Sequence, residues 1–310
     1  MKRRAFIQLL FAASLTPAQA LATIKQFDNT NSKKIVRPCD NDQIVLEEDD
    51  AATDANAHTG APLKDVPISD DNIKDYLSKI RAPNVPHRDD IYANAKEAQA
   101  LTRIADQFRV ITSLVGDANF SVMGFDDVLH FAKTHSKIEE FAKDDIRMME
   151  QLFSRNARDY GFYGEKQSPN ITEIIDRRDI YKVPYSGNFL FKGESLEKFG
   201  QIRKDLGEDL ILTSGIRSVV KQFYLFINKA LRYDANLSLA SRSLAPPGYS
   251  YHATGDFDVG QRGFGADNFT ENFLTTRIYK RLKSEGYVQY RYGRDNLLGV
   301  RFEPWHIKIV

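Results

Sequence analysis

The sequence predicts a protein of the α+β class, in which helices flank a small antiparallel sheet and a helical subdomain precedes it. Two observations support this prediction. Residues 89–165 carry apolar side chains at helical spacing. From Leu210 onward, short apolar or alternating segments of strand length occur between helical ones. Helices and strands that are segregated in this way around an antiparallel sheet are typical of the α+β class.

The first 20 residues have the pattern of a secretory signal peptide. Met1-Lys2-Arg3-Arg4 is positively charged, residues 5–15 are mostly apolar, and Ala18-Gln19-Ala20 is an A-x-A cleavage site. The apolar part is too short for a membrane span, which needs about 20 residues. We therefore expect an exported protein of the periplasm or cell envelope without a stable membrane span. The Arg3-Arg4 pair fits the twin-arginine export route as well as the general secretory one.

Composition limits the remaining possibilities. The chain has 310 residues, which is enough for one large domain or two modest ones. Its formal net charge is +1, and removal of Lys2, Arg3 and Arg4 with the signal peptide lowers it to −2. Nucleic-acid binding needs a strongly basic face, so this charge gives no support for it. Cys39 is the single cysteine, so neither an intrachain disulfide nor a cysteine-based metal site can form.

Residues 21–88 are expected to be mostly a disordered linker. Residues 47–56 are acidic and small, with little apolar surface to bury. Pro83 and Pro86 lie among polar residues, as in a linker. One short helix is expected within this region, over Asp71–Ile80.

Three helices are expected in the subdomain of residues 89–165. The first runs over Asp89–Val115 and stops at Gly116, the second over Phe125–Lys133, and the third from Ser136 or Lys143 to Asp159, before Gly161. The apolar stripe of the first helix consists of Ile91, Ala95, Ala98, Leu101, Ile104, Phe108 and Ile111. Its regular spacing predicts that this helix contributes one face to a core.

Residues 166–310 are expected to form the catalytic domain, which contains both strands and helices. The expected elements are a strand at Leu210–Thr213, helices at Val219–Leu231 and Phe269–Glu285 with Gly286 after the second, and strands at Tyr287–Tyr292 and Gly299–Val310 joined by a turn at Arg294–Asn296.

Glu303-Pro304-Trp305-His306 is the first sign of chemistry. A carboxylate and an imidazole in an apolar run are costly to bury without partners, and a metal ion would supply one. His252 and Asp258 upstream would complete a His/Asp/His set with His306. Catalytic Zn²⁺ commonly takes three protein ligands and keeps a position for water. Glu303 then fits the role of general base for that water.

These residues also carry a family resemblance. Ser250-x-His252-x-x-Gly255, a following Asp and the Glu303–His306 cluster together resemble the LAS-type zinc peptidases, and most nearly the D-alanyl-D-alanine carboxypeptidases of the vancomycin-resistance type. Ser214-Gly215-Ile216-Arg217-Ser218, followed by Gln222, resembles a third block of that family. The resemblance covers roughly residues 180–310 and implies a zinc-dependent peptide hydrolase.

One departure concerns the third ligand. In the family, the aspartate usually follows the histidine by seven positions. In this sequence Asp258 follows His252 by six positions, and Asp256 follows it by four. In a strand both carboxylates would point to the same face, so either could reach a metal. Asp258 is favoured, because a one-residue deletion after Gly255 keeps the aspartate followed by an apolar residue. Asp256 would then orient a ligand or contact substrate.

The resemblance also implies roles for other residues. The Arg217 guanidinium would hold a substrate carboxylate or the oxyanion that develops on the scissile carbonyl. Gln222 and Ser250 are expected to bind the peptide, with capping of local backbone as the alternative. Trp305 is expected either to line the substrate cleft or to pack in the core.

The sequence thus predicts an exported zinc metallopeptidase that acts on peptidoglycan stem peptides containing D-alanine, in the first place a D-alanyl-D-alanine carboxypeptidase. An L,D-carboxypeptidase or an endopeptidase that cuts cross-links would use the same residues, so both stay open. A non-catalytic module that binds the cell wall is the alternative from another class.

Overall fold

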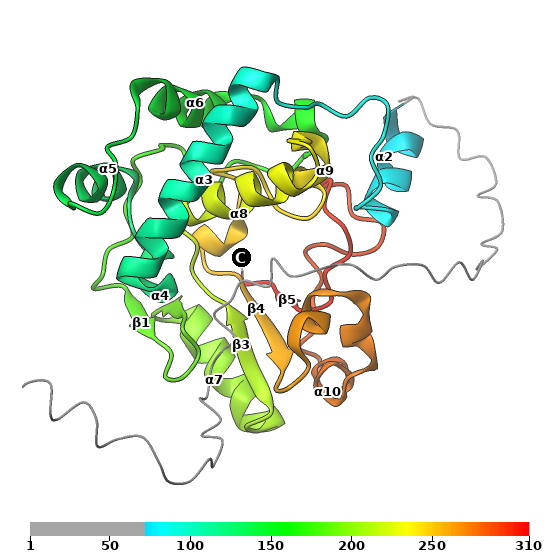
Figure 1. Cartoon of the computed structure of the whole chain (residues 1–310). Helices are drawn as coiled ribbons and strands as arrows, with labels where there is room; N and C mark the ends of the chain where they lie inside the picture. Colours follow the sequence, from blue (N-terminus) through cyan, green and yellow to red (C-terminus); the bar gives the residue numbers. More distant parts are fainter. Residues whose placement is uncertain (1–71, 310) are drawn as a thin grey trace, which may run out of the picture. The chain divides into compact units, whose positions relative to one another are not determined.

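Helices and two small antiparallel sheets make up residues 72–309, the part of the chain that the computed structural model describes (Figure 1). The α-helices are α2 (Asn72–Arg81), α3 (Ala95–Val115), α4 (Asp117–Phe120), α5 (Phe125–Thr134), α6 (Lys143–Ser154), α7 (Glu194–Leu206), α8 (Val219–Arg232), α9 (Leu237–Ser241) and α10 (Arg277–Ser284). The strands are β1 (Ile180–Lys182), β2 (Phe189–Phe191), β3 (Leu210–Ser214), β4 (Phe257–Gln261) and β5 (His306–Ile307). This mixture confirms the predicted α+β class. The predicted signal peptide, Cys39 and most of the predicted linker lie outside the described residues.

Helix α3 begins at Ala95, six residues later than expected. The Asn94 side chain accepts hydrogen bonds from the backbone N–H groups of Lys96 and Glu97, and the Glu97 carboxylate accepts one from the Asn94 N–H. This capping box fixes the start of the helix. Gly116 ends the helix, as predicted, with a φ of 81°.

The other helices of the N-terminal half follow the predictions in part. Helix α5 ends within one residue of its predicted end, at Thr134. The expected third helix is shorter, because α6 stops at Ser154 and Arg155 turns to an extended ψ of 146°. Asn156 then caps a separate 3-10 helix, Ala157–Tyr160, by accepting from the Arg158 N–H. A cap of this kind starts a new turn and so divides the predicted helix into two.

One hydrophobic core joins helices from before and after residue 165. Helix α8 packs on α3, and the apolar face of α8 is buried together with that of α3. Aromatic rings connect these helices through α4: the Phe120 ring lies 5.7 Å from Phe108 and 5.6 Å from Tyr224. The predicted helical subdomain therefore shares its interior with α8 and α9 of the predicted catalytic domain.

The C-terminal part of the chain contains a three-stranded antiparallel sheet, in the order β3-β4-β5. The register pairs Ser214 with Asp258 and Asp258 with His306. Residues directly opposite each other point to the same face of a sheet. The sheet therefore places these three side chains in one row, on the face from which the candidate site is built.

The predictions for residues 269–305 are largely wrong. The expected long helix is reduced to α10, because Thr276 caps a new helix by accepting from the Tyr279 N–H at 3.0 Å. The expected strands at Tyr287–Tyr292 and Gly299–Val310 are absent from the described residues, apart from β5. Backbone groups of this segment bond to loops instead: the Leu298 carbonyl accepts from Tyr163, and the Arg301 N–H donates to Arg242 at 2.7 Å.

Residues 82–90, between α2 and α3, contact the loop after α9. Arg242 and Asp90 form an ion pair whose side chains are 4% and 1% exposed. The Arg242 Nη1 also donates to the Val85 carbonyl at 2.9 Å, and Asn236 donates to Asp90 at 2.8 Å. The last residues of the predicted linker are thus bonded to the folded part. No helix within residues 72–309 is long and apolar enough to cross a membrane.

Replacing Asp90 by alanine tests this contact. Asp90→Ala leaves the buried Arg242 guanidinium without its partner, so we expect the free energy of unfolding to fall by about 3–5 kcal/mol. Asp106→Ala is the matched control, because it breaks the exposed Arg109–Asp106 pair, which contributes less than about 1 kcal/mol. Denaturant titration measures both values. Equal, small losses in the two variants would show that the buried pair does not hold the segment.

Candidate metal centre

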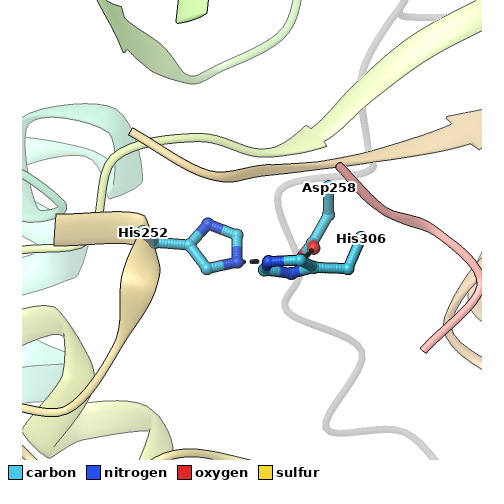
Figure 2. Close-up of side chains that lie close together, drawn as sticks. All are labelled: His252, Asp258 and His306. Atoms are coloured by element: carbon cyan, nitrogen blue, oxygen red, sulfur yellow. Dashed lines mark hydrogen bonds and ion pairs between the residues drawn. The ribbon is translucent and has the colours of Figure 1, made fainter. Parts of the chain in front are cut away.

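Three elements bring His252, Asp258 and His306 together (Figure 2). His252 lies on a 3-10 helix, Tyr251–Ala253, Asp258 on the central strand β4, and His306 on β5. One ligand atom from each residue lies within 4.8 Å of the others, and all three side chains are buried. The structure therefore gathers the three residues that the sequence predicted as metal ligands.

His252 is held in the tautomer that a metal ligand needs. Its Nδ1 lies 2.8 Å from the Gly215 carbonyl oxygen. A carbonyl can only accept, so Nδ1 carries the proton and Nε2 presents its lone pair toward the Asp258 carboxylate, 3.4 Å away. Burial, together with the nearby Arg217 guanidinium, lowers the pKa of His252, which keeps the ring neutral. A neutral imidazole is the form that binds metal.

His306 lies between two carboxylates. Its Nδ1 is 3.0 Å from Asp258 Oδ1, and its Nε2 is 2.9 Å from Asp256 Oδ2. Burial lowers the pKa of His306, but hydrogen bonds to Asp256 and Asp258 outweigh it and raise that pKa to about 9. A proton lies between His306 Nδ1 and Asp258 Oδ1. A divalent metal ion could replace this proton and bind both groups.

The two aspartates have different surroundings. Asp256 accepts from Arg291, from the His306 ring and from the Ile309 N–H at 2.8 Å. Burial raises the pKa of Asp256, but the bonds from His306 and Arg291 lower it to about 2. Asp256 therefore orients the His306 ring from the side away from Asp258, in the manner of carboxylates that support metal-binding histidines.

Asp258 faces both histidines. Its Oδ2 lies 3.4 Å from His252 and its Oδ1 3.0 Å from His306. Arg217 also donates to it, from Nη2 at 2.7 Å. Burial alone would raise the pKa of Asp258, but the positive charge and hydrogen bonds around it lower that pKa far below its usual value. An ionised carboxylate between two imidazoles is a good ligand set for zinc.

Glu303 lies next to His252, Asp258 and His306 but is not one of the three candidate ligands. Its Oε2 lies 3.9 Å from His306 Nδ1, and the residue is 9% exposed. Burial and the negative charge of Asp258 raise the pKa of Glu303 to about 7. General bases work best when their pKa lies near the operating pH, so Glu303 suits proton transfer at neutral pH.

Arg217 connects β3 to the centre. Its Nε donates to the Ser214 Oγ at 2.9 Å, while its Nη2 holds Asp258. The side chain is 13% exposed and lines the same cleft as Glu303. The guanidinium thus fixes the orientation of a candidate ligand and borders the space that a substrate would enter.

The cleft has a volume of about 260 Å³ and is lined by α8, β3, the loop at residues 243–250 and the C-terminal segment. Ser250 and Trp305, both predicted to bind substrate, lie in its wall. Trp305 also packs edge-on against Phe269, with ring centroids 6.1 Å apart. Trp305 therefore lines the cleft and also packs in a hydrophobic core.

Gln222 is not among the residues that line this cleft. The side chain is buried, and its Nε2 donates to the Ala245 carbonyl at 2.5 Å. Gln222 therefore bonds to backbone that is distant in the sequence, and not to the local backbone that the alternative prediction named. Its contact fixes the loop that carries Ser250 rather than the substrate itself.

Arg291 and Tyr292 were not predicted as site residues, and both were placed in the expected strand at Tyr287–Tyr292. Arg291 pairs with Asp256, and its guanidinium lies 3.6 Å from the Tyr251 ring centroid. The Tyr292 ring packs 5.1 Å from His306, and burial together with the Glu303 charge raises the pKa of Tyr292 well above its usual value. The one available signal was an arginine within an apolar run, which requires a buried partner.

Solved structures with 24–25% identity to this chain were found. The LdcB LD-carboxypeptidase is 24% identical with a TM-score of 0.35, and the alignment covers 42% of this chain and 63% of LdcB, less than two thirds of it. A mutant of the vancomycin-resistance D,D-pentapeptidase VanY, in complex with Zn(II), is 25% identical with a TM-score of 0.35, over 42% and 78%. VanYB in complex with D-alanine-D-alanine is 24% identical with a TM-score of 0.35, over 42% and 76%.

Comparison with protein families gives a match in the C-terminal part of the chain. No curated protein matches the chain. Residues 193–310 match the family model VanY, described as D-alanyl-D-alanine carboxypeptidase. This range contains every residue of the cluster described above. The predicted resemblance is confirmed by this match: residues 193–310 are similar to the VanY D-alanyl-D-alanine carboxypeptidase family.

Proposed function

We propose that this protein is an exported zinc metallopeptidase that removes the terminal D-alanine from peptidoglycan stem peptides, as a D-alanyl-D-alanine carboxypeptidase. The observation that carries the proposal is the convergence of His252, Asp258 and His306 beside Glu303, in one wall of a cleft. The VanY family match over residues 193–310 supports a carboxypeptidase that acts on peptidoglycan. Such a substrate lies outside the cytoplasm, which agrees with the predicted signal peptide and a location in the periplasm or cell envelope.

His252 Nε2, His306 Nδ1 and the Asp258 carboxylate would hold the zinc ion. The residues fit this group, because the Gly215 carbonyl and the Asp256 carboxylate each occupy the other ring nitrogen and so direct the lone pairs to one point. When bound, zinc supplies a Lewis acid and lowers the pKa of a bound water to about 7.

Glu303 performs the proton transfers. Its carboxylate takes a proton from the attacking water and delivers it to the nitrogen of the leaving D-alanine. A pKa near 7 allows both steps, because the group is readily protonated and deprotonated at neutral pH. The cleft wall holds Glu303 by its backbone, since its N–H donates to the Tyr292 carbonyl at 3.1 Å.

Arg217 and Ser250 act on the substrate. The Arg217 guanidinium stabilises the negative charge that develops on the scissile carbonyl oxygen or holds the terminal carboxylate. Ser250 offers a hydroxyl and Trp305 an apolar ring among the residues that line the cleft. Together these groups orient a peptide whose C-terminus is anionic.

A pair of asparagine variants tests the ligand assignment. Asp258→Asn removes a proposed ligand, so we expect loss of bound zinc, measured as metal content after dialysis. Asp256→Asn keeps a hydrogen-bond acceptor for His306, so we expect zinc to remain bound with about 10–100-fold weaker affinity. Zinc loss in Asp256→Asn together with full zinc content in Asp258→Asn would reverse the assignment of the two aspartates.

Glu303→Gln tests the general base. It removes the proton acceptor but keeps the size of the side chain, so we expect kcat to fall by about 10²–10⁴-fold with unchanged zinc content. Glu285→Gln is the control, because this exposed carboxylate pairs with Arg281 on the surface and should not affect kcat. Full activity in Glu303→Gln would remove Glu303 from the mechanism.

Defined stem peptides test the bond that is cut. We expect zinc-loaded protein to release D-alanine from a pentapeptide ending in D-alanyl-D-alanine, detected by mass spectrometry of the products. Cleavage of the tetrapeptide alone would identify an L,D-carboxypeptidase, and cleavage of a cross-linked dimer an endopeptidase. If zinc-loaded protein binds but cuts none of the three, the non-catalytic wall-binding module is the better description.

A further inference from the structure

Arg291 is a largely buried arginine next to the candidate metal centre. Its side chain is 9% exposed, and it lies in residues 285–305, a described segment that contains no helix or strand. Among residues 72–309, the cleft is lined by Tyr292 but not by Arg291, so Arg291 does not face the space that a substrate would enter. A guanidinium is costly to bury without partners, and its contacts therefore indicate its role.

One contact of Arg291 leads to His306. The guanidinium donates to both carboxylate oxygens of Asp256, from Nε to Oδ2 and from Nη2 to Oδ1 at 3.2 Å. The same Oδ2 lies 2.9 Å from His306 Nε2, and Oδ1 accepts from the Ile309 N–H at 2.8 Å. Two bonds from one guanidinium fix the plane of a carboxylate. Arg291 therefore fixes the oxygen atom that orients the His306 ring.

Another contact of Arg291 leads to His252. The guanidinium carbon lies 3.6 Å from the centroid of the Tyr251 ring, which is within the range of a cation–π interaction. Tyr251 and His252 are adjacent on one 3-10 helix. The Tyr251 carbonyl also accepts from the Asp256 N–H at 3.2 Å. Arg291 thus contacts the turn that carries one histidine and the carboxylate that orients the other.

We propose that Arg291 is a positioning residue of the metal centre. It acts on His306 through Asp256, and on His252 through the Tyr251 ring that it covers. The inference rests on the proposed function, because both histidines are zinc ligands there. A lysine cannot take over this role, since its ammonium group offers neither a planar fork to a carboxylate nor a flat face to an aromatic ring. Arg291 therefore holds two ligand-bearing segments in the arrangement that one shared ion requires.

Zinc affinity, measured by competition with a coloured chelator, tests this role. Arg291→Gln removes the charge and the fork, so we expect the zinc dissociation constant to rise about tenfold. Arg291→Lys should recover only part of this loss, because it restores the charge alone. In cobalt-substituted protein, Arg291→Gln should also alter the visible spectrum, which reports ligand geometry. Arg294→Gln is the matched control, since this arginine of the same segment pairs with Glu271 at the surface and should change neither readout.

A double variant separates positioning from a general structural role. If Arg291 acts through Asp256, the loss in Asp256→Asn already contains most of its effect. Arg291→Gln added to Asp256→Asn should then raise the zinc dissociation constant by less than about threefold, whereas independent effects would multiply. The melting temperature of the metal-free single variants shows whether either change destabilises the fold.

Each outcome decides the inference. Wild-type zinc affinity and an unchanged cobalt spectrum in Arg291→Gln overturn it, as does wild-type affinity in Arg291→Lys if the glutamine variant does not fold. Losses that multiply in the double variant, with a lower melting temperature of metal-free Arg291→Gln, show a structural role only and also overturn it.

The same measurements keep the inference distinct from the proposed function. If wild-type protein binds zinc but cleaves no stem peptide, the proposed peptidase fails, and the zinc affinities of the variants still decide the role of Arg291. If wild-type protein binds no zinc, the metal centre fails and the inference fails with it.

Discussion

The pairing of β4 with β5 is the constraint on which the candidate centre depends. It sets Asp258 opposite His306, and β3 on the other side of β4 sets Ser214 opposite Asp258. Because side chains alternate between the faces of a strand, a slip of one residue would turn His306 away from the cleft. Hydrogen bonds then fix the side chains that the register brings together. Arg217 donates to both Ser214 and Asp258, and Asp256 is bonded to His306 Nε2.

The helices before residue 193 share an interior with the part of the chain that matches the family model. Helix α8 belongs to the family-matched part of the chain, yet it packs on α3 and buries its apolar face in the core that the earlier helices share. Its opposite face lines the cleft. The N-terminal helices therefore fix the position of α8, and through it the width and charge of the space in front of the metal centre.

Sequence patterns were informative where structure is local. The end of α3 at Gly116 and strand β3 were predicted and depend on neighbouring residues, whereas the start of α3 at the Asn94–Glu97 capping pair was missed. Motif spacing likewise singled out His252, Asp258 and His306, which the structure brings together. The segment from Tyr287 to Phe302 was misjudged, because its backbone bonds to Tyr163 and Arg242, far away in sequence. The contact of Gln222 with Ala245 is equally invisible in a linear pattern.

The shortness of β5 has a mechanical consequence. Two residues supply few backbone bonds, so side chains must hold most of the C-terminal segment against β4. A cation bound by groups on β4, β5 and the preceding 3-10 helix would act as a cross-link between three pieces of chain. Binding to the folded state alone raises stability by mass action. Metal binding and the pairing of β5 with β4 would then be one cooperative event. Loss of the metal would therefore remove the proposed catalytic activity and, at the same time, let the C-terminal segment separate from β4 more easily.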